Sequence, residues 1–386
     1  MRHRQQLIKV ITALLILLAS SGVFAKDSWK KVGRIVAIGD LHGDYEQFRA
    51  VLKMTGLIDN RGRWSGGKTH LVQTGDIPDR GPDSIKIIRD LQKLAKSARR
   101  ARGYVHLLIG NHEAMNVYGD LRYVHQGEYQ ALINKQSLNK QSDYYQRFIT
   151  YLASGETDTV FDEAFKKSWM LRYPAGYVEH RTIWEPSGEL GKWVAKNNAV
   201  IRINDSLFVH GGINPHLPLL PIKTINKMIR QDLTKTPLPE GSIVDSADGP
   251  LWYRGLAQAP EETELPDLIK MLDYYKAKRI VMGHSTTQGV INPRFDGRTI
   301  VIDVGLATHY GRGMAALIIE GDILKVLHRG VEVSLPPTDD GLTSYYKSLE
   351  SLEPNPEYVQ KIIQQLELLD NPMPETQSPP PTLEGG

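Results

Sequence analysis

The sequence contains no cysteine among its 386 residues. Disulfide bonds, thiolate metal ligands and a lipid-modified N-terminal cysteine are therefore all excluded. The fold must be held by its hydrophobic core alone, and any metal site must use oxygen and imidazole ligands.

Neither sign of charge dominates the chain. The sequence has 47 Lys and Arg residues against 44 Asp and Glu residues, a formal net charge of +3. The one compact basic run, at Arg99, Arg100 and Arg102, follows a predicted helix and is interpreted as a solvated helix end. Without a broader basic stripe, no nucleic-acid partner is expected.

Long hydrophobic runs are scarce, and the clearest one lies near the N-terminus. Basic residues precede an apolar run over residues 10–19, and Val23-Phe24-Ala25 then reads as a processing site. This pattern predicts a signal peptide over 1–25, cleaved near Ala25, and hence a periplasmic or secreted protein with no stable membrane anchor. A retained transmembrane helix is the alternative, although the run is short for a bilayer span.

The first part of the remaining chain alternates between short β-branched runs and amphipathic segments. Such alternation indicates an α/β unit with a largely parallel sheet. The expected strands are 34–40, 70–76 and 104–110, and the expected helices are 45–54 and 84–96.

The second part is organised differently. Residues 114–196 are polar, aromatic and mostly helical in pattern, with the clearest helix over 158–172, and are interpreted as an insertion or cap. Strand patterns then predict hairpins at 199–209, 292–303 and 315–327, and a strand at 279–283. We therefore expect a domain over 26–353 built as a four-layer α/β/β/α sandwich, a helix over 354–370 and a disordered Pro-rich tail over 371–386.

Polar side chains follow five of the expected strands, where each strand ends. The motifs are GDLHG at 39–43, GDIPDRG at 75–81, GNHE at 110–113, VHGG at 209–212 and GHS at 283–285. In α/β sheets the carboxyl ends of strands meet at the ligand crevice. Each motif alone fits a turn or a structural histidine, but the five together predict a metal site.

The residue types suit a pair of cations. Carboxylate, amide and imidazole ligands favour Mn, Fe or Zn ions, and one shared carboxylate can hold two cations about 3.5–4 Å apart. A water held between them can lose a proton near neutral pH, and the hydroxide that results can attack phosphorus.

The motif series resembles that of the calcineurin-like metallophosphoesterases, and it spans residues 34–327. GDIPDRG and GNHE are similar to the phosphoprotein phosphatase branch in particular. The stretches at 110–124, 249–255 and 302–319 look like those of Shewanella-like protein phosphatases.

This resemblance implies a role for each motif residue. His112 would be the general acid, and Asp79 would hold it protonated; Arg80 and Arg254 would clamp the phosphate. Arg254 also fits a surface arginine after an aromatic strand end. The implied metal ligands are Asp40 and His42 for one ion, Asp76 as the bridge, and Asn111, His210 and His284 for the other.

Two departures from related patterns bear on specificity. Ser285 and Thr286 stand where many superfamily members complete a Gly-His-x-His motif, which favours the protein-phosphatase branch over phosphodiesterases and nucleases. His309 and Tyr310 occupy the place of a eukaryotic signature, where they either shape the substrate mouth or pack as a loop.

The resemblance therefore implies a two-metal phosphomonoester hydrolase that acts on phosphorylated proteins, peptides or small phosphomonoesters. Phosphotyrosine is expected ahead of phosphoserine and phosphothreonine. Hydrolysis of nucleotides or dinucleoside polyphosphates is one alternative, and an inactive phosphate-binding module is another.

Overall fold

The computed structural model describes residues 26–155 and 159–370. The predicted signal peptide at 1–25 and the predicted tail at 371–386 lie outside these residues.

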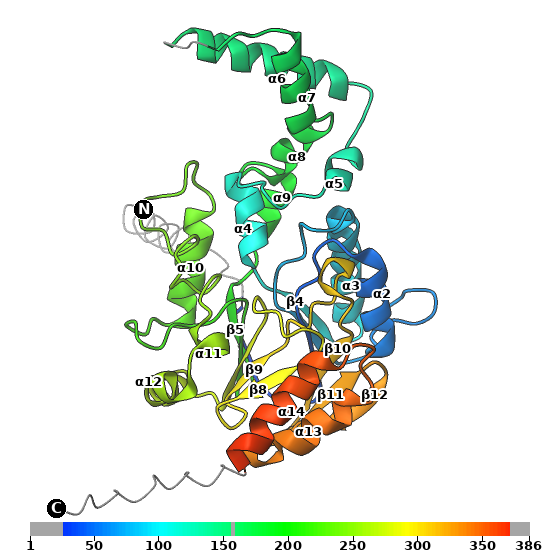
Figure 1. Cartoon of the computed structure of the whole chain (residues 1–386), viewed down its shortest axis with the longest axis vertical. Helices are drawn as coiled ribbons and strands as arrows, with labels where there is room; N and C mark the ends of the chain where they lie inside the picture. Colours follow the sequence, from blue (N-terminus) through cyan, green and yellow to red (C-terminus); the bar gives the residue numbers. More distant parts are fainter. Residues whose placement is uncertain (1–25, 156–158, 371–386) are drawn as a thin grey trace, which may run out of the picture.

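The centre of the molecule consists of two mixed sheets that face each other (Figure 1). The first sheet has the order β1 (Ser28–Trp29), β5 (Val200–Ile203), β6 (Ser206–Val209), β7 (Arg279–Met282), β9 (Thr299–Val301) and β8 (Asn292–Arg294). The second sheet has the order β12 (Val331–Ser334), β11 (Ile323–His328), β10 (Ala315–Glu320), β2 (Ile35–Ile38), β3 (His70–Gln73) and β4 (Tyr104–Leu107). Strands β2, β3 and β4 pair in parallel, as do β6, β7 and β9.

Alternation along the strands divides the core into an inner and an outer part. On β2, Ile35 and Ala37 join the cluster that fills the space between the sheets, whereas Val36 and Ile38 join the cluster beneath the helices. Both faces of this strand are therefore apolar, as its uninterrupted hydrophobic run requires.

Helices cover the outer face of each sheet. The helices α2 (Tyr45–Met54) and α3 (Ser84–Arg100) pack on the second sheet, while α10 (Ile222–Asp232) and α12 (Glu261–Tyr275) pack on the first. The predicted four-layer α/β/β/α sandwich is confirmed.

Two helices near the C-terminal end of the described chain cover the edge of the inner core. Tyr346 and Leu349 of α13 (Leu342–Glu350) and Val359 of α14 (Glu357–Asp370) belong to the inner cluster. Helix α14 lies within the segment for which a terminal helix is predicted.

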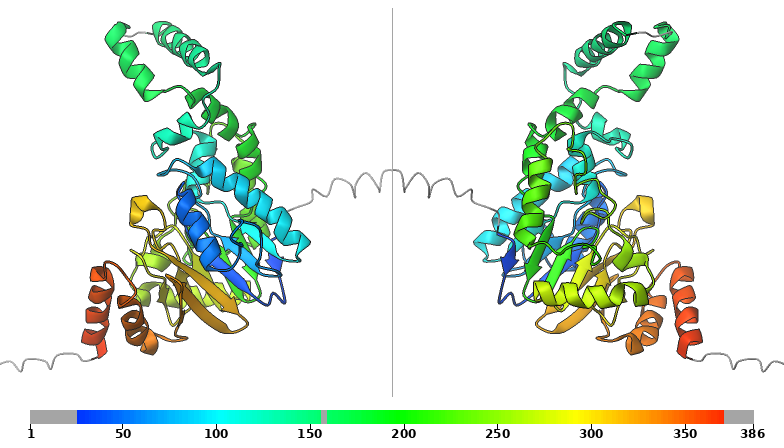
Figure 2. Two further views of the ribbon diagram at one scale, coloured as in Figure 1. Left: turned by 90° about the vertical axis from the view of Figure 1, so that its right-hand side faces the viewer. Right: turned by 90° about the vertical axis from the view of Figure 1, so that its left-hand side faces the viewer.

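A run of helices rises from the end of the sandwich that carries the strand C-termini (Figures 1 and 2). These helices are α4 (Asn111–Tyr118), α5 (Gln126–Gln130), α6 (Ser137–Ala153), α7 (Glu163–Arg172), α8 (Tyr177–Trp184) and α9 (Glu189–Val194). A shorter helix, α11 (Gly255–Gln258), precedes α12. Across the described ranges, no helix has both the length and the apolar character needed to cross a membrane.

The structure also corrects some details of the sequence interpretation. The helix expected over 158–172 begins only at Glu163, because Asp162 caps it by accepting the backbone N–H of Phe165. Arg99 and Arg100 lie inside the last turn of α3 and not after the helix. Strand β12 and helix α13 were not predicted.

Phe48 offers a test of the outer core. Its side chain on α2 is completely buried, so Phe48→Ala leaves a cavity and should lower the free energy of unfolding by about 3–5 kcal/mol in urea titrations. Tyr151→Ala is the control, since Tyr151 is 76% exposed and its loss should change stability by less than about 0.5 kcal/mol. Equal effects of the two changes would contradict this packing.

Candidate active site

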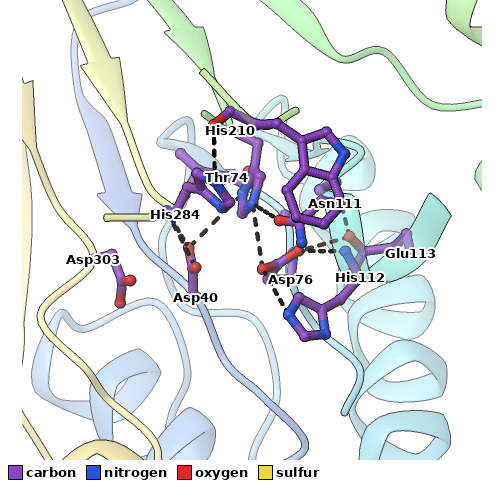
Figure 3. A network of polar contacts seen from close by, with 12 residues as sticks. Asp40, Thr74, Asp76, Asn111, His112, Glu113, His210, His284 and Asp303 are labelled. Atoms are coloured by element: carbon purple, nitrogen blue, oxygen red, sulfur yellow. Dashed lines mark hydrogen bonds and ion pairs between the residues drawn. The ribbon is translucent and has the colours of Figure 1, made fainter. Parts of the chain in front are cut away.

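All the predicted metal ligands lie together at the C-terminal ends of five strands. Figure 3 shows Asp40, Asp76, Asn111, His210 and His284. Each of the predicted ligands lies just after the strand that leads into its motif. Asp40 and His42 follow β2, Asp76 follows β3, Asn111 follows β4, His210 follows β6 and His284 follows β7. All six side chains are buried.

Asp76 lies at the centre of this cluster. It belongs to two groups whose potential ligand atoms lie within 4.8 Å of one another, one with His42 and His112 and the other with His210 and His284. Its Oδ2 is 3.3 Å from Nε2 of His210 and 3.9 Å from Nε2 of His42. Asp40 Oδ2 is also 3.9 Å from Nε2 of His42.

The three imidazoles are oriented by main-chain carbonyls. The Nδ1 of His42 lies 3.2 Å from Pro78 O and the Nδ1 of His210 lies 3.0 Å from Thr74 O. The Nε2 of His284 lies 3.2 Å from Trp252 O. If each of these nitrogens donates its hydrogen, the other ring nitrogen is left with a free lone pair. This is how metal-binding histidines are usually held, so the residues present fit a pair of cations.

The carboxylates of the cluster repel one another strongly. Burial, followed by the charges of Asp303 and Asp76, raises the pKa of Asp40 well above its ordinary value. Burial alone would raise the pKa of Asp76, but His210 and His112 together lower it well below its ordinary value. Positive charge placed among these groups would offset the repulsion.

His112 is held in a different way from the other histidines. Its Nδ1 lies 2.5 Å from Oδ2 of Asp79, whose Oδ1 accepts a hydrogen bond of 2.9 Å from the Asn116 amide. Burial would lower the pKa of His112, but Asp76 and Asp79 raise it above its ordinary value. A protonated imidazole donates protons and does not bind cations, so His112 is better suited to an acid role than to metal binding.

The two predicted arginines contact different parts of the site. The Arg80 guanidinium carbon lies 4.0 Å from the ring centroid of Tyr123, and Arg80 Nε is buried without a hydrogen-bond partner in the structure. Arg254 Nη1 donates to His284 O over 2.8 Å and to Ser285 Oγ over 3.1 Å. Both side chains are partly buried.

The sequence interpretation gave no role to several residues that build the site. Glu113 accepts hydrogen bonds from the backbone N–H groups of Asp76, Ile77 and Gly110. Asn116 supports Asp79, as described above, and Asp303 accepts from Thr286 Oγ1 over 2.9 Å. Glu113 stood inside the GNHE motif, which was its only signal; the other two carried none beyond the family-like stretches around them.

Several ligands occupy a left-handed backbone conformation that few residues adopt. His42, Asp76 and His284 have φ values of 45°, 57° and 65°. Gly75, just before Asp76, has a φ of 105°, and a Cβ built on it would lie 2.6 Å from the backbone nitrogen of Gly110. Strained backbone of this kind is common at functional sites.

Gly75→Ala should disrupt the cluster, because the new Cβ collides with backbone and the backbone angle disfavours alanine. We expect a clear loss of thermal stability together with a loss of bound metal, measured by elemental analysis. Gly321→Ala is the matched control: Gly321 also has a positive φ, 62°, but a Cβ added there would meet nothing within 4 Å. The control should cost about 1 kcal/mol and keep its metal. If Gly75→Ala also lost little stability and kept its metal, the close approach of Gly75 to Gly110 would not be needed for the cluster.

Comparison with known proteins gives the site a family. Residues 33–288, more than half of the chain, match the model of the calcineurin-like phosphoesterase family. Shewanella-like protein phosphatase 2 of Arabidopsis thaliana is 30% identical over 319 residues, which cover 78% of this chain and 78% of that protein. Shewanella-like protein phosphatase 1 of Plasmodium berghei is 29% identical over 296 residues, covering 74% of this chain and 71% of that one.

A solved structure agrees with these matches. A cold-active protein-tyrosine phosphatase of a psychrophilic Shewanella species superposes with a TM-score of 0.62 at 27% identity, covering 81% of this chain and 83% of that chain. With its buried cluster of carboxylate, amide and imidazole ligands, this chain belongs to the calcineurin-like phosphoesterase family and is similar to the Shewanella-like protein phosphatases.

Proposed function

We propose that this metal-dependent phosphatase hydrolyses phosphomonoesters on proteins or peptides, with phosphotyrosine preferred over phosphoserine and phosphothreonine. The observation that carries the proposal is the buried cluster around Asp76, together with His112, whose pKa is raised by Asp76 and Asp79. The N-terminal signal pattern supports the further proposal that the enzyme acts in the periplasm or outside the cell.

In this proposal, two divalent cations would be held around Asp76. Asp40 and His42 would bind one of them, Asp76 would be shared by both, and Asn111, His210 and His284 would bind the other. The 2.8 Å distance between Asn111 Oδ1 and His210 Nε2 supports placing these two ligands on the same ion. When bound, such a pair of cations activates a water for attack on phosphorus and balances charge on the phosphate oxygens.

His112 supplies the proton that the leaving oxygen needs. An ester oxygen leaves as a strong base unless it is protonated as the bond to phosphorus breaks. Asp79 keeps the Nδ1 side of His112 hydrogen-bonded, which favours the protonated ring and directs Nε2 toward the cluster. His112 therefore acts as the general acid, and Asp79 acts through it as a positioning residue.

Arg80 and Arg254 bind the phosphate oxygens that face away from the cations. A guanidinium group offers paired N–H donors that match two oxygens of one phosphate. The Tyr123 ring beneath Arg80 and the His284 carbonyl bound to Arg254 hold the two side chains in place.

Two tyrosine rings beside the cluster support the preference for phosphotyrosine. Tyr123 lies 5.1 Å from the His112 ring and Tyr310 lies 5.1 Å from the His42 ring, centroid to centroid. The phenyl ring of phosphotyrosine would stack against such rings, whereas a serine side chain is too short to reach them.

A panel of substrates tests the proposal on the metal-reconstituted enzyme. We expect kcat/KM to rank a phosphotyrosine peptide above the matched phosphoserine peptide, and both above diadenosine tetraphosphate. Tyr310→Ala should reduce the ratio of kcat/KM for the phosphotyrosine peptide to kcat/KM for the phosphoserine peptide. His309→Ala, at the adjacent exposed position, is the control and should leave this ratio unchanged. Preference for the dinucleotide would favour the alternative function, and no hydrolysis with any tested metal would refute the proposed activity.

Replacing His112 by asparagine tests the general-acid role. His112→Asn should lower kcat by about 10²–10⁴-fold while elemental analysis finds the metal content unchanged. The loss should be smaller for p-nitrophenyl phosphate than for phenyl phosphate, because nitrophenolate leaves readily without a proton. An equal loss for both esters would show that His112 has another role.

A further inference from the structure

A cavity lies away from the predicted metal ligands, where one edge of each sheet meets helix α3. It has a volume of about 550 Å³, and its walls include β4, Trp29 of β1, α3 and the chain that follows α9. None of the ligands in the Asp76 cluster lines it. β4 and β1 are edge strands of the two sheets, so side chains and not a further strand cover this side.

The cavity has a strongly positive lining. Lys26, Lys96, Arg99 and Lys196 contribute four cations, and no carboxylate is among the lining residues. In the part of the chain that the structure describes, none of the four forms a salt bridge with a carboxylate. Arg99 donates to the Tyr104 hydroxyl over 3.2 Å and Lys26 Nζ lies 5.3 Å from the Trp29 ring. The cavity is thus lined by exposed positive side chains and by no carboxylate, which favours binding of an anion.

Aromatic rings form the wall beside these cations. The Tyr104 and His106 rings stack with centroids 4.3 Å apart, and Trp29 meets His106 edge-on at 4.3 Å. Trp193 faces the same cavity and is only partly buried, as is Tyr104. Burial, followed by His70 and Lys26, lowers the pKa of His106 well below its ordinary value, so this ring adds flat surface and not charge.

Helix-end electrostatics explain only part of this arrangement. Basic residues are favourable in the last turn of a helix, and both Arg99 and Arg100 occupy that position in α3. Arg100 does not line the cavity, however, whereas Arg99 and Lys96, one turn earlier, both do. The helix dipole also gives no reason for Lys26 and Lys196 to converge on the same space from other parts of the chain.

We propose that this cavity binds a small organic phosphate that combines a planar ring with at least two negative charges, as a nucleoside diphosphate does. Its volume lies within the roughly 300–1,000 Å³ of typical small-molecule sites. The phosphates contact Lys96 and Arg99, and the ring packs against the partly exposed Tyr104 and Trp193. Binding here is separate from hydrolysis at the Asp76 cluster.

Isothermal titration of the full chain with α,β-methylene-ADP, which resists hydrolysis, tests the proposal. We expect saturable binding, with adenosine and pyrophosphate each at least about tenfold weaker because each lacks one half of the ligand. Quenching of tryptophan fluorescence should accompany binding and decrease in Trp193→Phe.

A pair of double variants places the binding site. Lys96→Gln with Arg99→Gln should weaken the affinity at least about tenfold. Lys93→Gln with Arg100→Gln removes the same charge from the same helix, at exposed positions that do not line the cavity, and should change the affinity less than twofold. Equal thermal midpoints of the two proteins would show that both are folded.

Three outcomes would overturn the proposal. The first is no binding at millimolar ligand. The second is an equal affinity for pyrophosphate, which would mean an anion site without ring recognition. The third is an equal effect of the two double variants, which would place the ligand elsewhere, for instance at the Asp76 cluster.

Discussion

One buried carboxylate, that of Glu113, holds the centre of this structure together. It accepts backbone hydrogen bonds from Asp76 over 2.9 Å, Ile77 over 2.7 Å and Gly110 over 2.8 Å. These donors belong to the loops after β3 and β4, so a single side chain fixes two strand ends relative to each other. The backbone N–H of His112 completes the link by donating to Asp76 Oδ1 over 2.9 Å. The spacing between the side chains of Asp76 and His112 therefore follows from hydrogen bonds to the main chain.

This arrangement concentrates negative charge where the chain is least solvated. Burial, followed by the charge of Asp76, raises the pKa of Glu113 to about 7, and burial raises that of Asp303 as well. A cluster of this kind is costly for a protein without compensating cations. Cations bound here would supply the positive charge that the protein leaves out, and their binding would then stabilise the strand ends.

The sequence predicted the layers, and also that the polar side chains after the strands come together, because both depend on local patterns. Apolar runs such as Ile35–Ile38 mark strands buried on both faces, and Gly-Asp or Gly-Asn pairs mark the points where those strands end. The sequence was less informative where long-range contacts decide the outcome. Strand β12 is largely exposed, and its Val-Glu-Val-Ser alternation is too short to mark a strand by itself. Asp303 lies outside the five motifs, and only the fold brings its charge near Asp40.

The helical segment above the sheets is also connected to the chemistry, through a contact that no sequence pattern shows. Arg181 of α8 donates to the main-chain carbonyls of Asn116 and Val117, near the end of α4. Asn116 in turn binds the carboxylate of Asp79 and the carbonyl of His112. A displacement of α8 would therefore reach His112 through the Arg181 side chain and one turn of α4. Helices α6 and α7 extend from the same segment into solvent (Figure 2), so this contact connects the outermost helices to the hydrogen bonds around His112.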